Sequence, residues 1–410
     1  MRNAVIGLII GIVAGIVLGT TVIAPRLAHN VKQEIGLTES AAPGAPAAAA
    51  DSQKTGQKTG QKTSQKTDQK STTTTAAPAA VAETPATGPA LRVNMASAYA
   101  EALAGHGTLA RRLEKTVWRI SNGTLDIRFN PPGALVKDSE ALDAVISGAI
   151  DAYFTDMDVL TARDPAMSLL AGPPFGASVA AYLGWMAGGG GRENLQGRLS
   201  ELGLGGMICG IVPHAAGGWF RKPLRTVEDI KGLRIRASGI TAGMYKRLGA
   251  DVVDFSFAET LIAMESGLLD GAQLSAPHID QALGAQRAGW TYYVPGWRTP
   301  ARVFVLLMAE KKWTSLSEVQ RSQLATACSD NIRHAIAEGE VLQFEALKQI
   351  IKSGADLQPW PGEITDAMRQ AWDEMAQEMQ KSSRPYSRVQ KSWRQFVKGQ
   401  SIWEELVRPK

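Results

Sequence analysis

The chain has 410 residues, of which 44% are hydrophobic and 20% are charged, proportions typical of a folded globular protein rather than a disordered or fibrous one. The net charge of +5 is not concentrated, because residues 1–90 hold eight of the 44 Lys/Arg and five of the 39 Asp/Glu, which leaves 36 against 34 in residues 91–410. This nearly neutral remainder argues against a nucleic-acid partner, which would need a dense basic surface.

The N-terminal segment predicts a membrane anchor. Residues 4–24 are uncharged and mostly apolar, and as a helix they would be about 32 Å long, close to the roughly 30 Å of a hydrocarbon core. A cleavable signal is the alternative, but the run is long for one and Pro25-Arg26 is a poor cleavage site. We therefore expect residues 1–24 to stay as a signal anchor in the inner membrane, with the rest of the chain in the periplasm.

Small residues recur at every fourth position of this anchor. They suit close contact with another membrane helix, although glycine is also frequent in membrane spans generally. The recurring residues are Gly7, Gly11, Gly15 and Gly19. The sequence leaves a homo-oligomer possible.

A low-complexity linker is predicted at residues 25–90. From about Ala41 to Pro89 it consists mainly of Ala, Pro, Thr, Ser, Gln and Lys, with a Gln-Lys-Thr unit repeated from Gln53 to Thr67. Such a composition cannot bury a core. We expect a disordered tether that holds the following domain near the membrane.

Residues 91–410 predict a mixed α/β domain. A strand at 91–95, a helix at 108–120 and a strand at 125–129 form a β-α-β start. The four glycines at 188–191 predict a flexible turn rather than a phosphate-binding loop, because no Lys-Ser/Thr follows them. Another strand is expected at 206–212. After residue 309 the pattern is helical, with Ser317 and Gln320 forming a capping box.

One sequence pattern occurs twice in this domain. In each copy a short amphipathic helix ends at a Gly suited to the left-handed conformation, and an apolar pair leads into a strand. The two copies are Glu140, Leu142, Ala144, Ser147, Gly148 and Asp151, and Glu259, Leu261, Ala263, Ser266, Gly267 and Asp270. The duplication predicts two lobes that face each other.

No constellation typical of an enzyme is present in the sequence. Four histidines, at 106, 214, 278 and 334, lack a partner at zinc-ligand spacing. Asp156 and Asp158 are spaced as an acid-base pair on one strand face, but exposed or capping carboxylates are the favoured interpretation. The two cysteines, Cys209 and Cys328, fit no metal motif, and buried thiols are favoured over a disulfide. We therefore expect a binding protein without a cofactor.

The middle of the chain resembles the solute-binding proteins of TRAP transporters (tripartite ATP-independent periplasmic transporters, DctP-like), particularly the branch for 2-oxo acids and related carboxylates. The resemblance covers about residues 90–400. Its motifs are Gly217 to Leu224, Val227 to Arg236, Ser266 to Ala272 and Tyr292 to Trp297. It implies a periplasmic-binding-protein-like fold whose two lobes close on a small organic acid. It also implies that a membrane permease driven by an ion gradient receives the solute.

The resemblance also implies domain limits and site residues. Lobe one is expected at about 91–213, lobe two at about 214–305, and a mainly helical part that braces the lobes at 306–410. Arg236 is expected to hold the substrate carboxylate, since a guanidinium offers two parallel donors to that group. The other expected substrate-binding residues are Phe154, Thr155, Asp156, Gln273, Leu274 and Trp297.

Several positions depart from the family pattern. In the 2-oxo acid branch, the residues at three of these positions together resemble a cation site. This sequence has Ala215, Gln273 and Leu274 there, which leaves too few oxygen ligands for a hard cation. We predict no metal, or weak metal binding. Asp156 is unusual beside a bound anion: it would meet an amino or hydroxyl group of the solute, or cap a helix. The alternative function is a membrane-tethered sensor or scaffold with a degenerate solute-binding domain.

Overall fold

The computed structural model describes residues 91–298 and 300–407. The predicted anchor at 1–24 and linker at 25–90 lie outside these residues. Within the described ranges, no helix is long and apolar enough to cross a membrane.

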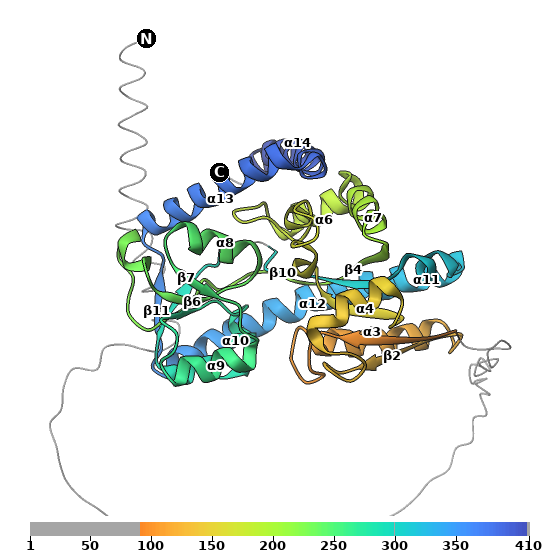
Figure 1. The fold of residues 1–410 in the computed structure, drawn as a ribbon, viewed down its shortest axis with the longest axis horizontal. Helices are drawn as coiled ribbons and strands as arrows, with labels where there is room; N and C mark the ends of the chain where they lie inside the picture. Colours follow the sequence, from red (N-terminus) through yellow and green to blue (C-terminus); the bar gives the residue numbers. More distant parts are fainter. Residues whose placement is uncertain (1–90, 299, 408–410) are drawn as a thin grey trace, which may run out of the picture. The chain divides into compact units, whose positions relative to one another are not determined.

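Strands of the described residues form two separate sheets, which lie on opposite sides of the molecule in Figure 1. The first has the order β2-β1-β3-β10-β4 and the second β11-β9-β5-β8-β6-β7. The first sheet contains β1 (Leu91–Ser97), β2 (Leu125–Asn130), β3 (Ala152–Asp156), β4 (Leu204–Val212) and β10 (Arg302–Ala309). The second contains β5 (Gly218–Phe220), β6 (Arg234–Arg236), β7 (Asp251–Val253), β8 (Gly271–Ala272), β9 (Thr291–Val294) and β11 (Asp356–Pro359). These sheets confirm the two-lobed α/β fold.

The repeated sequence pattern places one similar unit in each lobe. The first copy ends α4 (Ala141–Ser147) at Gly148, with φ +78°, and leads into β3. The second ends α9 (Phe257–Glu265) just before Gly267, with φ +77°, and leads into β8. Each following strand is parallel to a neighbour, β3 to β1 and β8 to β6.

Exchange of strands joins the two lobes. The chain returns from the second sheet through β10, which lies antiparallel between β3 and β4 of the first. It then crosses again, because β11 pairs with β9 in the second sheet. β10 therefore belongs to the first sheet, although its residues 302–305 fall within the range that the sequence predicts for lobe two.

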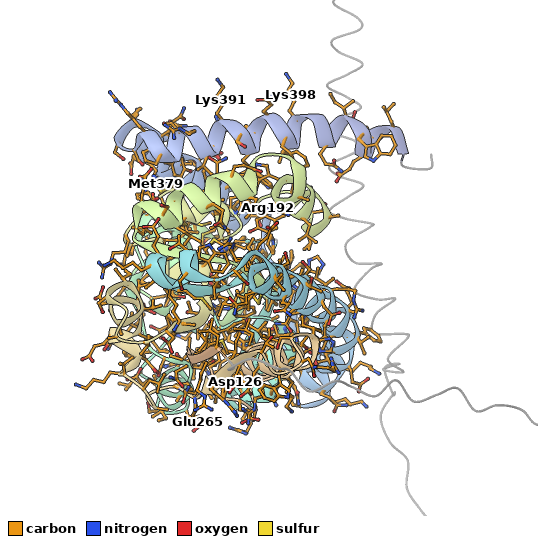
Figure 2. All side chains as sticks on the ribbon, turned by 90° about the vertical axis from the view of Figure 1, so that its right-hand side faces the viewer. Asp126, Arg192, Glu265, Met379, Lys391 and Lys398 are labelled. Carbon is orange, nitrogen blue, oxygen red and sulfur yellow. A yellow bond between two sulfur atoms is a disulfide. The ribbon has the colours of Figure 1, made fainter. Side chains whose placement is uncertain are left out.

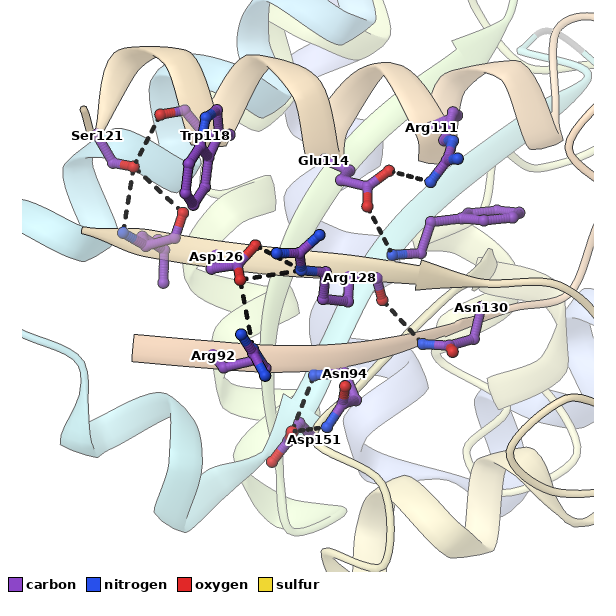
Figure 3. Close-up of polar contacts among 12 residues, drawn as sticks. Arg92, Asn94, Arg111, Glu114, Trp118, Ser121, Asp126, Arg128, Asn130 and Asp151 are labelled. Carbon is purple, nitrogen blue, oxygen red and sulfur yellow. Dashed lines mark hydrogen bonds and ion pairs between the residues drawn. The ribbon is translucent and has the colours of Figure 1, made fainter. Parts of the chain in front are cut away.

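One edge strand of the first sheet, β2, carries charged side chains. Asp126 on β2 accepts from Arg92 on β1 at 3.4 Å and from Arg128 at 2.9 Å (Figure 3). Charged side chains of this kind discourage further strand pairing at an edge.

Long helices brace both lobes, as predicted. The 35-residue α12 (Glu318–Lys352) packs on β4 and on α3 (Gly107–Ile120) of the first lobe and on α10 (Pro277–Leu283) of the second. α13 (Gly362–Ser382) packs on α8 (Gly239–Arg247) of the second lobe, and α14 (Arg384–Val407) on the helices of the first. The helices of the first lobe beneath α14 are α5 (Met167–Leu170), α6 (Val179–Gly188) and α7 (Gly191–Glu201).

The glycine run at 188–191 forms the junction between α6 and α7, which confirms the predicted turn. Gly190 has φ +93°, a left-handed conformation that favours glycine. A Cβ at Gly189 would lie 2.5 Å from the ring of Phe396, so this junction also lets α14 approach closely.

The prediction of two buried thiols is wrong, because Cys209 and Cys328 form a disulfide. Cys209 lies on β4 and Cys328 on α12, and the packing of this helix on the strand brings their Cα atoms to 4.2 Å. Both residues are buried. The bond links elements 119 residues apart in the sequence.

Candidate functional site

A cavity of about 630 Å³ lies between residues of the two lobes. The first lobe contributes Tyr99, Thr155 and Asp156, and the second contributes Arg236 and Phe257. Much of its wall is apolar. The apolar side chains include Ala98, Leu103, Pro132, Val159, Ala258, Leu261 and Leu283. We call this cavity the cleft.

Arg236 stands at the end of β6 with its side chain only 8% exposed. Its Nε donates to the Phe255 carbonyl at 2.9 Å and one terminal nitrogen to the Gln273 carbonyl at 2.7 Å. Among the described residues, the ion-pair partner of the other terminal nitrogen is the exposed Asp254 carboxylate at 4.0 Å. The guanidinium is thus held mainly by backbone carbonyls, and its recorded counter-charge is distant and exposed. Its neighbour on the strand, Arg234, is exposed.

Burial foremost, and then the positive charge of Arg302, lower the pKa of Arg236 to about 10, against the raising effect of Asp254 and Asp156. The guanidinium therefore remains charged at neutral pH, but burial makes its charged form less stable than it would be in water. An anion in the cleft would stabilise that charged form.

Arg302, at the start of β10, is a cleft residue that the sequence analysis missed. One terminal nitrogen contacts the Asp156 carboxylate at 3.1 Å and the other donates to the Leu274 carbonyl at 3.0 Å. Burial alone would lower the pKa of Arg302, but Asp156 foremost raises it overall. A sequence signal existed, since Arg302 is a lone charge at the head of an otherwise apolar strand.

Asp156 contacts three protein groups at the cleft. Besides Arg302, it accepts from the Tyr99 hydroxyl at 2.5 Å, and its other oxygen accepts from the Asp158 backbone at 3.0 Å. This last bond caps the short 3-10 helix η3 (Met157–Leu160). Of the two roles expected for Asp156, the structure shows the cap.

Asp158 does not act with Asp156 as an acid-base pair. Its carboxylate contacts the guanidinium of Arg298 at 2.5 Å, while that of Asp156 is paired with Arg302. Each carboxylate therefore has its own counter-charge, and the capping interpretation favoured from the sequence agrees with these contacts.

An aromatic ring connects the two arginines of the cleft. The guanidinium carbons of Arg236 and Arg302 lie 5.4 Å and 5.7 Å from the ring centre of Phe257. This arrangement stabilises two positive groups from different sheets beside the same space.

The remaining predicted site residues are placed differently. Thr155 lines the cleft, but Phe154 is buried against Phe304, with ring centres 5.7 Å apart. Gln273 and Leu274 line a small hollow of about 20 Å³ next to the cleft, together with Arg298 and Arg302.

Trp297 lines neither space. It is buried between aromatic rings, with its centre 4.5 Å from that of Trp360 and 5.8 Å from that of Phe175. In this structure Trp297 therefore packs in the core rather than lining the cleft.

Comparison with known protein families shows to which family the chain belongs. Residues 96–383 match the model of the bacterial extracellular solute-binding proteins, family 7 (DctP). The chain belongs to this family. Its members are binding proteins rather than enzymes, in agreement with the sequence analysis.

Individual DctP relatives are distant in sequence. A monocarboxylate 2-oxoacid-binding periplasmic protein of Nostoc sp. is 28% identical over 281 residues, which are 68% of this chain and 76% of the relative. A C4-dicarboxylate-binding periplasmic protein of Vibrio cholerae is 23% identical over 272 residues, or 65% and 78% of the two chains.

Solved structures share the two-lobed fold. A TRAP transporter solute-binding protein of Bordetella bronchiseptica, with copurified calcium and picolinate, has a TM-score of 0.75 at 24% identity and covers 78% of this chain and 95% of its own. One of Pseudoalteromonas atlantica, with sodium and pyruvate, has a TM-score of 0.72 at 24% identity, with coverage of 78% and 97%.

Proposed function

We propose that the protein captures a small organic carboxylate in the cleft and delivers it to a TRAP-type permease driven by an ion gradient. Arg236 is the anchor for the carboxylate in this proposal. The observation that carries it is the guanidinium of Arg236, which is buried at the cleft and fixed by two backbone carbonyls, while its ion-pair partner among the described residues, Asp254, is exposed and 4.0 Å away. A planar guanidinium in this state offers parallel donors to one carboxylate.

Closure of the lobes would follow from contacts made on both sides of the cleft. Arg236 comes from the second sheet, whereas Tyr99, Thr155 and Arg302 come from the first lobe. A solute that contacts both groups binds the closed form more tightly than the open one and shifts the protein towards it.

Known relatives support a carboxylate as the solute. The Nostoc relative binds monocarboxylate 2-oxoacids, and other proteins of this fold were solved with pyruvate, picolinate, pyroglutamate or galacturonate. All of these solutes carry a carboxylate, although the rest of each molecule differs.

Binding without a tightly held metal remains a prediction. Two of the structural relatives contain calcium or sodium. In this chain the hollow lined by Gln273 and Leu274 is also lined by Arg298, Arg302 and Asp158. Arg298 is paired with Asp158, and Arg302 with Asp156, so these carboxylates are already engaged by guanidinium groups. Together with the shortage of oxygen ligands noted in the sequence, this supports the prediction.

The disulfide of the domain fits a periplasmic location. The Cys209–Cys328 disulfide is of a kind that persists in oxidising compartments such as the periplasm. We further propose that residues 1–24 anchor the domain to the inner membrane. The linker at 25–90 would then hold the domain near the membrane and let it turn.

Thermal unfolding of the protein with a panel of acids tests the proposal. Pyruvate, picolinate, pyroglutamate and galacturonate form the panel, and at least one should raise the melting temperature. Arg236→Ala should weaken binding of that acid by at least about 2 kcal/mol, or about thirtyfold, because charge-assisted hydrogen bonds are lost.

Arg234→Ala is the matched control, since Arg234 lies on the same strand but is exposed. It should leave the acid-induced shift unchanged. An equal shift for the wild-type protein and Arg236→Ala would remove Arg236 from the site. Failure of every acid to stabilise the wild-type protein would favour the alternative of a sensor or scaffold with a degenerate cleft.

A further inference from the structure

Five charged side chains line the cleft. They are the two arginines Arg236 and Arg302 and the three aspartates Asp156, Asp158 and Asp254. Among the described residues, no lysine, glutamate or histidine lines this space. The cleft therefore has more fixed negative groups than positive ones, although the anchor proposed for the solute is positive.

Arg302 differs from Arg236 because protein groups already bind all three of its nitrogens. Its Nε donates to the Ser275 hydroxyl at 3.3 Å, one terminal nitrogen contacts the Asp156 carboxylate at 3.1 Å, and the other donates to the Leu274 carbonyl at 3.0 Å. The side chains of Arg302 and Asp156 are only 12% and 13% exposed. A solute carboxylate would have to compete with Asp156 for this guanidinium.

The other two aspartates of the cleft would repel a second carboxylate of the solute. Asp158 is paired with Arg298, which lines the neighbouring hollow rather than the cleft. Asp254 is 4.0 Å from a terminal nitrogen of Arg236, beyond the length of a hydrogen bond. Of the two cleft arginines, Arg236 is thus the one that can receive a carboxylate. A dianion would bring its second charge close to aspartates without a free guanidinium to receive it.

Apolar side chains from both lobes form much of the remaining wall. The first lobe contributes Ala98, Leu103, Pro132 and Val159, and the second contributes Phe257, Ala258, Leu261 and Leu283. Among the described residues, no asparagine or glutamine side chain lines the cleft. An apolar group of the solute would gain affinity by leaving water there, whereas a hydroxyl group without a partner would lose affinity. The volume of about 630 Å³ leaves room for such a group beside the carboxylate.

We infer, on the basis of the proposed function, that the solute is a monocarboxylate with an apolar body of several carbon atoms. Arg236 binds the carboxylate, and the body lies between Val159 of the first lobe and Leu261 of the second. Asp156 is a specificity-determining residue in this arrangement. By pairing with Arg302 it neutralises the second positive group, which would otherwise favour a dicarboxylate.

Calorimetric titration of the full-length protein in mild detergent with three 2-oxo acids tests the inference. Pyruvate, 2-oxohexanoate and 2-oxoadipate share one head group, but the second has a longer apolar chain and the third ends that chain in a carboxylate. 2-Oxohexanoate should bind about fiftyfold more tightly than pyruvate, because three further methylene groups leave water. It should bind at least about tenfold more tightly than 2-oxoadipate. Cyclohexanecarboxylate should likewise bind more tightly than galacturonate, whose ring carries hydroxyl groups.

Asp156→Asn tests the role of this carboxylate in specificity. Because Arg302 then lacks its counter-charge, the affinity for 2-oxoadipate relative to 2-oxohexanoate should rise at least about tenfold. Asp158→Asn is the matched control, since it changes the charge of the cleft equally but frees Arg298, which does not line the cleft. This control should leave the ratio of the two affinities unchanged. Both affinities are measured on the same variant, so a loss of stability does not alter their ratio.

A second pair of variants tests the apolar wall and does not depend on the folding of Asp156→Asn. Leu261→Ala should lower the preference for 2-oxohexanoate over pyruvate several-fold, because part of the wall is removed. Ile262→Ala is its control, since the neighbouring Ile262 is 66% exposed and does not line the cleft. Figure 2 shows Glu265, the last residue of α9, and the α14 residue Lys398 at opposite edges of the molecule. A substitution on α9 therefore does not act through α14.

The outcomes separate this inference from the proposed function. If pyruvate, 2-oxoadipate or galacturonate binds as tightly as its apolar counterpart, the inference is overturned while carboxylate binding stands. Equal shifts of the ratio for Asp156→Asn and Asp158→Asn would overturn the role of Asp156, because net charge rather than Arg302 would then set the preference. Absence of binding by all five acids would contradict the proposed function itself.

Discussion

Removal of the Cys209–Cys328 disulfide should strongly destabilise the domain. The bond closes a loop of 119 residues between β4 of the first sheet and α12, the helix that contacts both lobes. In the chain-entropy description, closing a loop of this length lowers the entropy of the unfolded chain enough to contribute about 5 kcal/mol of stability. The paired variant Cys209→Ala/Cys328→Ala should lose about this amount.

Urea unfolding followed by tryptophan fluorescence measures the loss. Alanine is the suitable replacement because both cysteines are buried and serine would add an unpaired hydroxyl. The reduced wild-type protein should unfold close to the paired variant, and Cys209→Ala alone should match it within about 1 kcal/mol, because one substitution already opens the loop. Equal midpoints for the oxidised and reduced proteins, or two free thiols in the protein taken from the periplasm, would refute this reasoning.

Three further predictions concern single groups, all measured by urea unfolding. Asp156→Asn keeps the helix cap but removes the counter-charge of buried Arg302, so it should cost about 3 kcal/mol, and an unchanged midpoint would contradict the ion pair. Asp280 is a buried residue of α10 that accepts from Trp219 and from the Tyr292 hydroxyl. Burial raises its pKa from 3.8 to about 6, so the stability that its neutral form contributes is present below pH 3.8 and is lost as the pH rises through 6. The difference in stability between wild type and Asp280→Asn should thus fall by about 2 kcal/mol between pH 4 and 7, and a flat difference would exclude the shift. Ser317→Ala removes the capping box of α12 and should cost about 1 kcal/mol, whereas Ser315→Ala is the control outside the cap.

Features set by neighbouring residues could be predicted from the sequence. The capping box of Ser317 and Gln320, the glycines that end the two repeated units, and the first β-α-β unit all appear in the structure within a few residues of the expected positions. Their physical causes are hydrogen bonds and backbone preferences within a few residues of chain.

Features that depend on distant packing could not be predicted. The disulfide forms because α12 packs on β4, and no spacing in the sequence encodes that contact. Arg302 reaches the cleft because β10 inserts between β3 and β4, and the same insertion provides the counter-charge of Asp156. The short β11 was not expected at all, since its pairing with β9 is decided by the second lobe.

Native mass spectrometry of the gently purified protein tests the central claim most directly. The wild-type protein should carry a single small organic acid that is released on collisional activation, and Arg236→Ala, purified in the same way, should carry none. Arg234→Ala should retain the acid, because this side chain is exposed on the same strand. A wild-type protein that carries no small molecule and gains none from added carboxylates would contradict the account of the cleft as a carboxylate site.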